Sequence, residues 1–132
     1  MKRYLIAFLL ACILNLAWEE LHSVLYASFR GGEITHPLLF FMAVKDALVI
    51  IILILLLRSR TGFRKYPSLL IAAGIIFSIV IEIHALQTGR WAYSEAMPLI
   101  PFLGTGLTPT IQIGLLAYLI YSVIFSRTNS RS

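Results

Sequence analysis

The acidic residues of this chain are the side chains most able to do chemistry. Four of the six lie inside stretches that are otherwise apolar: Glu19, Glu20, Asp46 and Glu82. A carboxyl group in hydrocarbon is costly and by default indicates a functional site. Only Lys45 inside these stretches, with Arg90 reaching down from a loop, can balance four carboxylates. We therefore expect at least one acid to keep its proton at neutral pH, and a neutral carboxyl group in an apolar pocket is a proton donor.

These acids have different expected roles. Glu19 is the expected catalytic acid, and Asp46 or Glu82 is expected to assist it or to accept the proton. Glu20 lies about 100° around the helix from Glu19, so it lines the same pocket or forms a pair at a helix interface. For Lys45 the alternative is a purely structural ion pair with one of the acids.

Around Glu19, polar and aromatic side chains follow one helical stripe. Asn15, Glu19, His22 and Tyr26 are spaced four, three and four residues apart, with Trp18 beside them. This spacing predicts a substrate-binding wall whose aromatic faces stabilise a cation. The alternative is a packing seam, because Asn and His side chains also form hydrogen bonds between membrane helices.

Glu19 and His22 also form a Glu-x-x-His pair, the spacing of ligands in di-iron helix bundles. Such sites need a second pair, and His84 lies two residues from Glu82, on roughly the opposite helix face. A metal site would need Asp46 or a second protomer. We expect no metal and no cofactor.

The segment 87–108 forms a second constellation. It is long for a connection between helices and carries Arg90, Trp91 and Tyr93 near glycines. Such a loop above a polar layer predicts a lid over a substrate site, to which Gln112 on the next helix also contributes. For Tyr93 the alternative is an aromatic anchor at the membrane interface.

The elements that position these residues follow from composition. The chain has 132 residues, of which 59% are hydrophobic and 13% charged, with a mean hydropathy of +0.88. This predicts an all-α, polytopic membrane protein whose single domain, 1–132, has four transmembrane helices at about 4–29, 37–57, 67–86 and 109–125. Three of these begin with proline at the first helical position, and Thr108 is the expected N-cap of the last.

Basic residues orient the bundle. One side carries Lys2, Arg3, Arg58, Arg60, Arg64, Lys65, Arg127 and Arg131, whereas the other carries Arg30 and Arg90. The positive-inside rule then predicts a multi-pass protein of the cell membrane with both termini in the cytoplasm. The net charge of +5 is explained by this topology and indicates no nucleic-acid partner.

All four helices place polar groups in the outer half of the membrane. Counting at about 1.5 Å per residue puts Glu19 and Asp46 about 12 to 13 Å below the outer boundary, and Glu82 and Gln112 about 5 to 6 Å below it. The inner halves of the second and third helices carry no ionisable group. This asymmetry predicts a pocket closed on the cytoplasmic side.

The segment Asn15-Leu-Ala-Trp18-Glu19, with Tyr26, resembles the Asn-x-x-Trp-Glu segment of the integral-membrane terpene cyclases of fungal meroterpenoid and indole-diterpene pathways. The resemblance implies that Glu19 acts as an acid on an epoxide or alkene. It implies for Asp46 or Glu82 the role of that family's second acid. Those enzymes have more than four helices.

The outer loop has a pattern of its own. Gly89-Arg90-Trp91-x-Tyr93, Met97-Pro98 and Gly106-Leu107-x-Pro109-x-x-Gln112 resemble a pattern of small uncharacterised bacterial four-helix membrane proteins.

The leading hypothesis is a membrane enzyme that performs acid–base cyclisation or isomerisation of a lipid-soluble, isoprenoid-like substrate. The alternative is a small carrier or transporter subunit that binds a proton, cation or solute and works as a homo-oligomer. A structural assembly factor is the third hypothesis. A pocket closed on one side argues against transport in a single conformation.

Overall fold

The computed structural model of the chain describes residues 1–63 and 65–126. Four helices in this part are long and apolar enough to cross a membrane. They are α1 (Lys2–His22), α2 (His36–Arg58), α3 (Leu69–Gln87) and α4 (Leu107–Ile124). The predicted number of helices long and apolar enough to span a membrane and the mostly helical fold are thereby confirmed.

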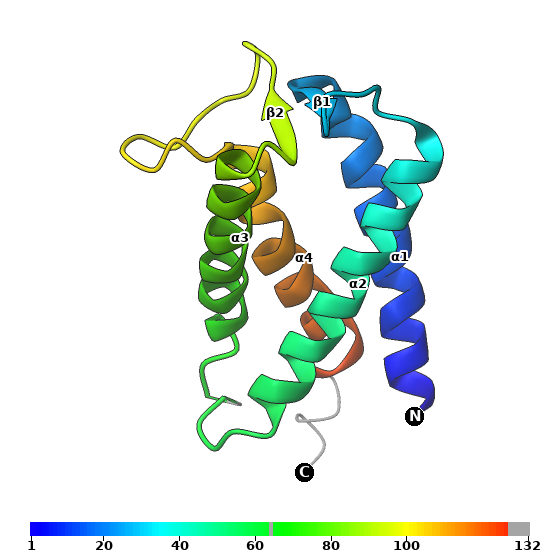
Figure 1. Cartoon of the computed structure of the whole chain (residues 1–132). Coiled ribbons are helices and arrows are strands. Elements are labelled where there is room, and N and C mark those ends of the chain that lie inside the picture. Colours follow the sequence, from blue (N-terminus) through cyan, green and yellow to red (C-terminus); the bar gives the residue numbers. More distant parts are fainter. Residues whose placement is uncertain (64, 127–132) are drawn as a thin grey trace.

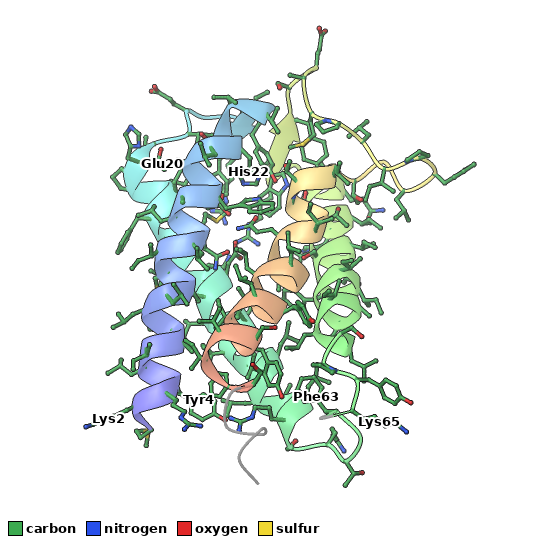
Figure 2. The ribbon with its side chains drawn as sticks, turned by 180° about the vertical axis from the view of Figure 1, so that it is seen from behind. Lys2, Tyr4, Glu20, His22, Phe63 and Lys65 are labelled. Atoms are coloured by element: carbon green, nitrogen blue, oxygen red, sulfur yellow. The ribbon has the colours of Figure 1, made fainter. Side chains whose placement is uncertain are left out.

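The two ends of the bundle differ in charge. Figure 1 shows the N-terminus and the α2–α3 connection at one end and two short strands at the other. In Figure 2, Lys2, Tyr4, Phe63 and Lys65 lie at the first end, and Glu20 and His22 lie at the second. We call these the basic end and the sheet end. Arg64, Arg127 and Arg131, which the predicted orientation also uses, lie outside the described residues.

The sheet end holds a feature that the sequence prediction missed. α1 ends at His22 instead of Phe29, and a 3₁₀ turn (Ser23–Leu25) and strand β1 (Tyr26–Phe29) follow. β1 pairs antiparallel with β2 (Trp91–Tyr93). The aromatic residues of both strands favour extended backbone over helix. The predicted end of the first helix at residue 29 is therefore wrong, and Tyr26 lies on a strand instead of the helical stripe.

Proline was predicted at the start of three helices, and this prediction holds only for α2. Pro37 lies in the first turn of α2. Pro67 lies before α3, and Pro109 is the third residue of α4, because α4 begins at Leu107. Thr108 is therefore not the N-cap but the second residue of the helix, and its hydroxyl bonds elsewhere.

Helices α3 and α4 touch through two glycines. A Cβ on Gly74 would lie 2.2 Å from the Cα of Gly114, and one on Gly114 would lie 2.5 Å from the Ile71 carbonyl oxygen. Small residues allow such close helix approach in membrane proteins. This contact fixes the pair that carries Glu82 and Gln112.

Aromatic packing fills the basic end. The Arg58 guanidinium lies 4.5 Å from the ring centroid of Phe125, and its Nη1 donates to the Tyr4 hydroxyl at 2.7 Å. The Phe63 and Tyr121 rings pack 5.1 Å apart beside them. The apolar core of the bundle continues from these rings toward the middle of the helices.

Candidate functional site

The polar cluster at the sheet-end half of the bundle is centred on Gln112 of α4. Its amide nitrogen lies 2.9 Å from Asn15 Oδ1, 3.0 Å from Glu19 Oε1 and 3.2 Å from Asp46 Oδ2. Asn15 donates its own amide N–H to the Ala11 carbonyl at 2.8 Å, which fixes its Oδ1 as an acceptor. One amide thus joins α1, α2 and α4. Gln112 contacts both acids through its side chain, although counting along the helices places its backbone nearer the outer boundary than theirs.

This cluster has more acceptors than protons. A glutamine amide carries two N–H protons, and three oxygens surround it. The Glu19 and Asp46 carboxyl groups also lie close enough to hydrogen-bond each other when one of them carries a proton. A hydrogen bond between two carboxyl groups requires that one of them keeps its proton. Each of the three oxygens around the amide therefore has a hydrogen-bond donor when Glu19 and Asp46 share one proton.

His22 connects Glu19 to the sheet end. Its Nε2 lies 3.2 Å from Glu19 Oε2, and its Nδ1 lies 3.0 Å from the Thr108 hydroxyl. In either neutral tautomer one ring nitrogen donates and the other accepts, so the chain Thr108–His22–Glu19 is a continuous hydrogen-bonded path. Thr108 is half-buried, at the start of α4.

Glu82 of α3 has a separate set of donors. The indole N–H of Trp91 donates to Glu82 Oε2 at 3.1 Å, and the Tyr93 hydroxyl donates to the same oxygen. The backbone N–H of Gly106 donates to the Tyr93 oxygen at 2.9 Å. Burial and the bond to Glu82 raise the pKa of Tyr93 above that of an ordinary phenol, so Tyr93 stays a donor.

Aromatic rings lie between the surroundings of Glu19 and those of Glu82. The Tyr26 ring lies edge-on to His22 at 5.3 Å and to Trp91 at 6.2 Å, and it lies 5.4 Å from the Tyr93 ring. Burial, followed by the charge of Glu82, raises the pKa of Tyr26 far above the usual phenol value. Trp18 contacts the edge of His22 at 6.4 Å.

A cavity of about 140 Å³ lies against this cluster. Apolar side chains of α2 and α3 form its sides, and β1 and β2 lie over it. The predicted site residues that line it are Glu19, Tyr26, Lys45, Asp46, Glu82, Arg90, Trp91 and Gln112. The predicted site residues outside its lining are Asn15, Trp18, His22 and Tyr93. Three of these four hydrogen-bond a lining residue, whereas Trp18 packs behind His22.

Sequence reasoning missed several polar residues of the site, among them Ser78 and Thr108. Ser78 lines the cavity and is buried, and its hydroxyl has no hydrogen-bond partner among the described residues. It lies one helical turn before Glu82 on the same face of α3, and this spacing could have identified it. Thr108 was expected to cap a helix and instead bonds His22.

Glu20 lies outside the cavity. Its carboxylate pairs with the exposed His36 ring at 2.8 Å. This contact fits the second of the two predicted roles, a pair at a helix interface.

Within the described residues, no group of three or more His, Cys, Asp or Glu side chains is placed to hold a metal ion. The Glu19–His22 pair instead forms a hydrogen bond. No family model, curated protein or solved structure matches the chain.

Proposed function

We propose that the chain crosses the cell membrane four times with both termini in the cytoplasm. Large apolar side chains are exposed along all four helices, as lipid contact requires. At the sheet end Phe102 is fully exposed on a loop with the exposed Leu99 and Leu103, which suits the membrane interface better than water. Basic side chains gather at the opposite end.

Cysteine labelling tests this orientation. A cysteine at Ser94 should react with a membrane-impermeant reagent added outside, and one at the exposed Ser59, at the basic end, should react only after permeabilisation. The reverse pattern would overturn the proposed orientation.

We further propose an integral membrane enzyme that performs acid–base cyclisation or isomerisation of a lipid-soluble, isoprenoid-like substrate. The single observation that carries this proposal is the close approach of the Glu19 and Asp46 carboxyl groups at the wall of a mostly apolar cavity, an arrangement that favours one proton between them. A proton held in such a place is available to a bound alkene or epoxide and is kept from bulk water. The resemblance at Asn15-Leu-Ala-Trp18-Glu19 supports the same chemistry.

The acids, the aromatic rings and His22 then have separate roles in one reaction. The Glu19–Asp46 pair donates its proton to the substrate, and the ring faces of Tyr26 and Trp91 stabilise the resulting cation. Glu82, held by Trp91 and Tyr93, accepts a proton from the neighbouring carbon, which forms a new double bond. His22 returns a proton to Glu19 along the path from Thr108, which takes it from water at the sheet end, and Glu82 releases its proton to water before the next turnover, so no net proton is consumed.

The size of the cavity limits what enters it. Pockets that enclose a whole drug-sized ligand measure about 300 to 1,000 Å³, and this one measures about 140 Å³. Only the reacting end of a long chain fits. The rest of the chain would lie in the bilayer. It would leave the cavity past the apolar side chains of α2 and α3, which include Leu38, Met42 and Ile81.

The test is to identify lipids that co-purify with the protein by mass spectrometry and to follow their conversion. Glu19→Gln keeps the size and most hydrogen bonds of a neutral carboxyl group but cannot donate its proton. We expect this variant to bind the lipid and to convert it at least about a hundredfold more slowly, as is typical of a lost general acid. Glu20→Gln, one residue away and outside the cavity, is the matched control and should convert at the wild-type rate.

An unchanged rate in Glu19→Gln would contradict the enzyme proposal. So would wild-type proteoliposomes that move a proton or solute while altering no lipid, and the carrier hypothesis would then replace it.

A further inference from the structure

Two cations face the same cavity without a salt bridge to a carboxylate of the described residues. Lys45 of α2 and Arg90, just before β2, both line it, and their charges lie close enough to act on each other. Neither forms an ion pair with any described residue. Their nearest stabilising contacts are aromatic: the Lys45 ammonium lies 5.9 Å from the Phe41 centroid, and the Arg90 guanidinium lies 5.7 Å from that of Trp91.

The carboxyl groups of the cavity are held by other donors. Glu82 accepts from Trp91 and Tyr93. Glu19 is held by His22 and Gln112, and Asp46 by Gln112 and Glu19. The acids are therefore held by neutral donors and by each other, and Asp46 also by the charge of the neighbouring Lys45. Neither cation forms a hydrogen bond with any of these acids among the described residues. Arg90 Nε is buried with no hydrogen-bond partner among the described residues.

Two like charges that face a low-dielectric cavity repel each other and are costly to desolvate. A ligand that brings negative charge between them removes both costs. The Lys45 ammonium lies near the ring of Phe41, which is one turn nearer the sheet end of α2. Arg90 lies between the end of α3 and β2, so both cations lie toward the sheet end of the cavity.

We propose that Lys45 and Arg90 bind the anionic head group of an amphiphile whose apolar chain lies between α2 and α3. The sides of the cavity there are apolar, with Met42 and Val49 on α2 and Phe77 on α3. A volume of about 140 Å³ does not hold a folded chain, so the head group and the reacting carbons are the same end of the ligand.

This inference names the substrate class of the enzyme proposed above. It rests on that proposed function only in calling the ligand a substrate, because binding of the anion itself does not require turnover. Binding of the anion is measured without turnover, so the two proposals fail independently. Loss of conversion in Glu19→Gln concerns the acid. Loss of binding when the cations are removed concerns the anion site.

The first experiment needs no variant. Full-length protein in nanodiscs of neutral phosphatidylcholine is titrated with farnesyl phosphate, with farnesol and with inorganic phosphate, and binding is followed by native mass spectrometry. We expect farnesyl phosphate to bind at least about tenfold more tightly than farnesol, the scale of a hydrogen bond to a charged group. Inorganic phosphate, which lacks the apolar chain, should bind more weakly than farnesyl phosphate. Equal binding of farnesol and farnesyl phosphate would overturn the proposal.

Variants then locate the head group. Lys45→Gln and Arg90→Gln should each weaken farnesyl phosphate binding about tenfold and leave farnesol binding unchanged. Arg30→Gln removes an exposed cation at the same end that does not line the cavity, so it should bind like the wild type. Lys45→Arg, which keeps the charge, should retain binding. If Arg30→Gln loses as much affinity as the two cavity variants, the attraction is general and the proposed site is wrong.

A competitor separates the two sources of such a ligand. If phosphatidylglycerol added to the nanodisc displaces farnesyl phosphate, a bilayer lipid is a ligand of the anion site. If it does not displace it, the site selects a single-chain phosphate, as a substrate site would. Both outcomes support the anion site.

Discussion

Replacing Gln112 with leucine removes the shared donor of three buried oxygens. The Gln112 side chain is 3% exposed, so water does not replace the lost bonds. Its amide satisfies two of the three oxygens at a time, and hydrogen bonds between membrane helices contribute about 0.6 to 1.7 kcal/mol each. Gln112→Leu should therefore lower the free energy of unfolding by about 1 to 3 kcal/mol, twice the value of a single bond.

The assay is reversible unfolding of the purified protein in mixed micelles, with detergent composition as the denaturing variable. Ser122→Ala is the control in the same helix, because the Ser122 hydroxyl bonds only the Tyr118 carbonyl of its own helix. Its stability should stay within about 0.5 kcal/mol of the wild type. A Gln112→Leu protein as stable as Ser122→Ala would refute the claim that this amide joins three helices.

The same variant makes a second check possible. Asn15→Leu removes one of the three acceptors, so combining it with Gln112→Leu should cost less than the sum of the single changes. We expect a coupling of at least about 0.5 kcal/mol, as for residues in one hydrogen-bond network. Full additivity would mean that the two side chains do not interact.

Three further outcomes follow from the packing and the phenols. Gly114→Ala should cost about 1 to 3 kcal/mol in the unfolding assay, because its Cβ meets backbone, whereas Gly32→Ala, with its nearest contact at 3.4 Å, should change little; equal effects would contradict the close α3–α4 contact. Tyr93→Phe should cost about 1 to 3 kcal/mol, since a carboxylate loses a donor and a backbone N–H loses its acceptor, and unchanged stability would contradict that bond. The raised pKa values of Tyr26 and Tyr93 predict that the Tyr26→Phe/Tyr93→Phe double variant loses no ionisation step near pH 10 in an alkaline absorbance titration; loss of such a step would contradict their burial.

The sequence predicted the spanning helices because their signal is local. An apolar run of about 20 residues crosses a bilayer whatever its partners are, so α2 and α3 were predicted to within two residues. The end of α1 was predicted wrongly for the opposite reason. Residues 23–29 are apolar enough to continue a helix, and only pairing with Trp91–Tyr93, far away in sequence, holds Tyr26–Phe29 extended.

For the candidate site too, the sequence predicted the local signal but not the contacts made across the fold. Buried acids are visible in a sequence as charges inside apolar runs, and this singled out Glu19, Asp46 and Glu82. Their partners depend on tertiary contacts. Sequence spacing gave no means to show that Gln112 contacts both Glu19 and Asp46, or that the Thr108 hydroxyl meets His22 instead of capping α4.

Infrared difference spectroscopy tests the shared proton most directly. At neutral pH the wild type should show a protonated-carboxyl band, which Asp46→Asn removes and Glu19→Gln shifts or removes, because the two groups share one hydrogen bond. Glu82→Gln should leave the band in place, since Trp91 and Tyr93 already supply donors to a carboxylate there. A wild type without the band, or a band that only Glu82→Gln removes, would contradict the proton-sharing pair and the acid–base function proposed from it.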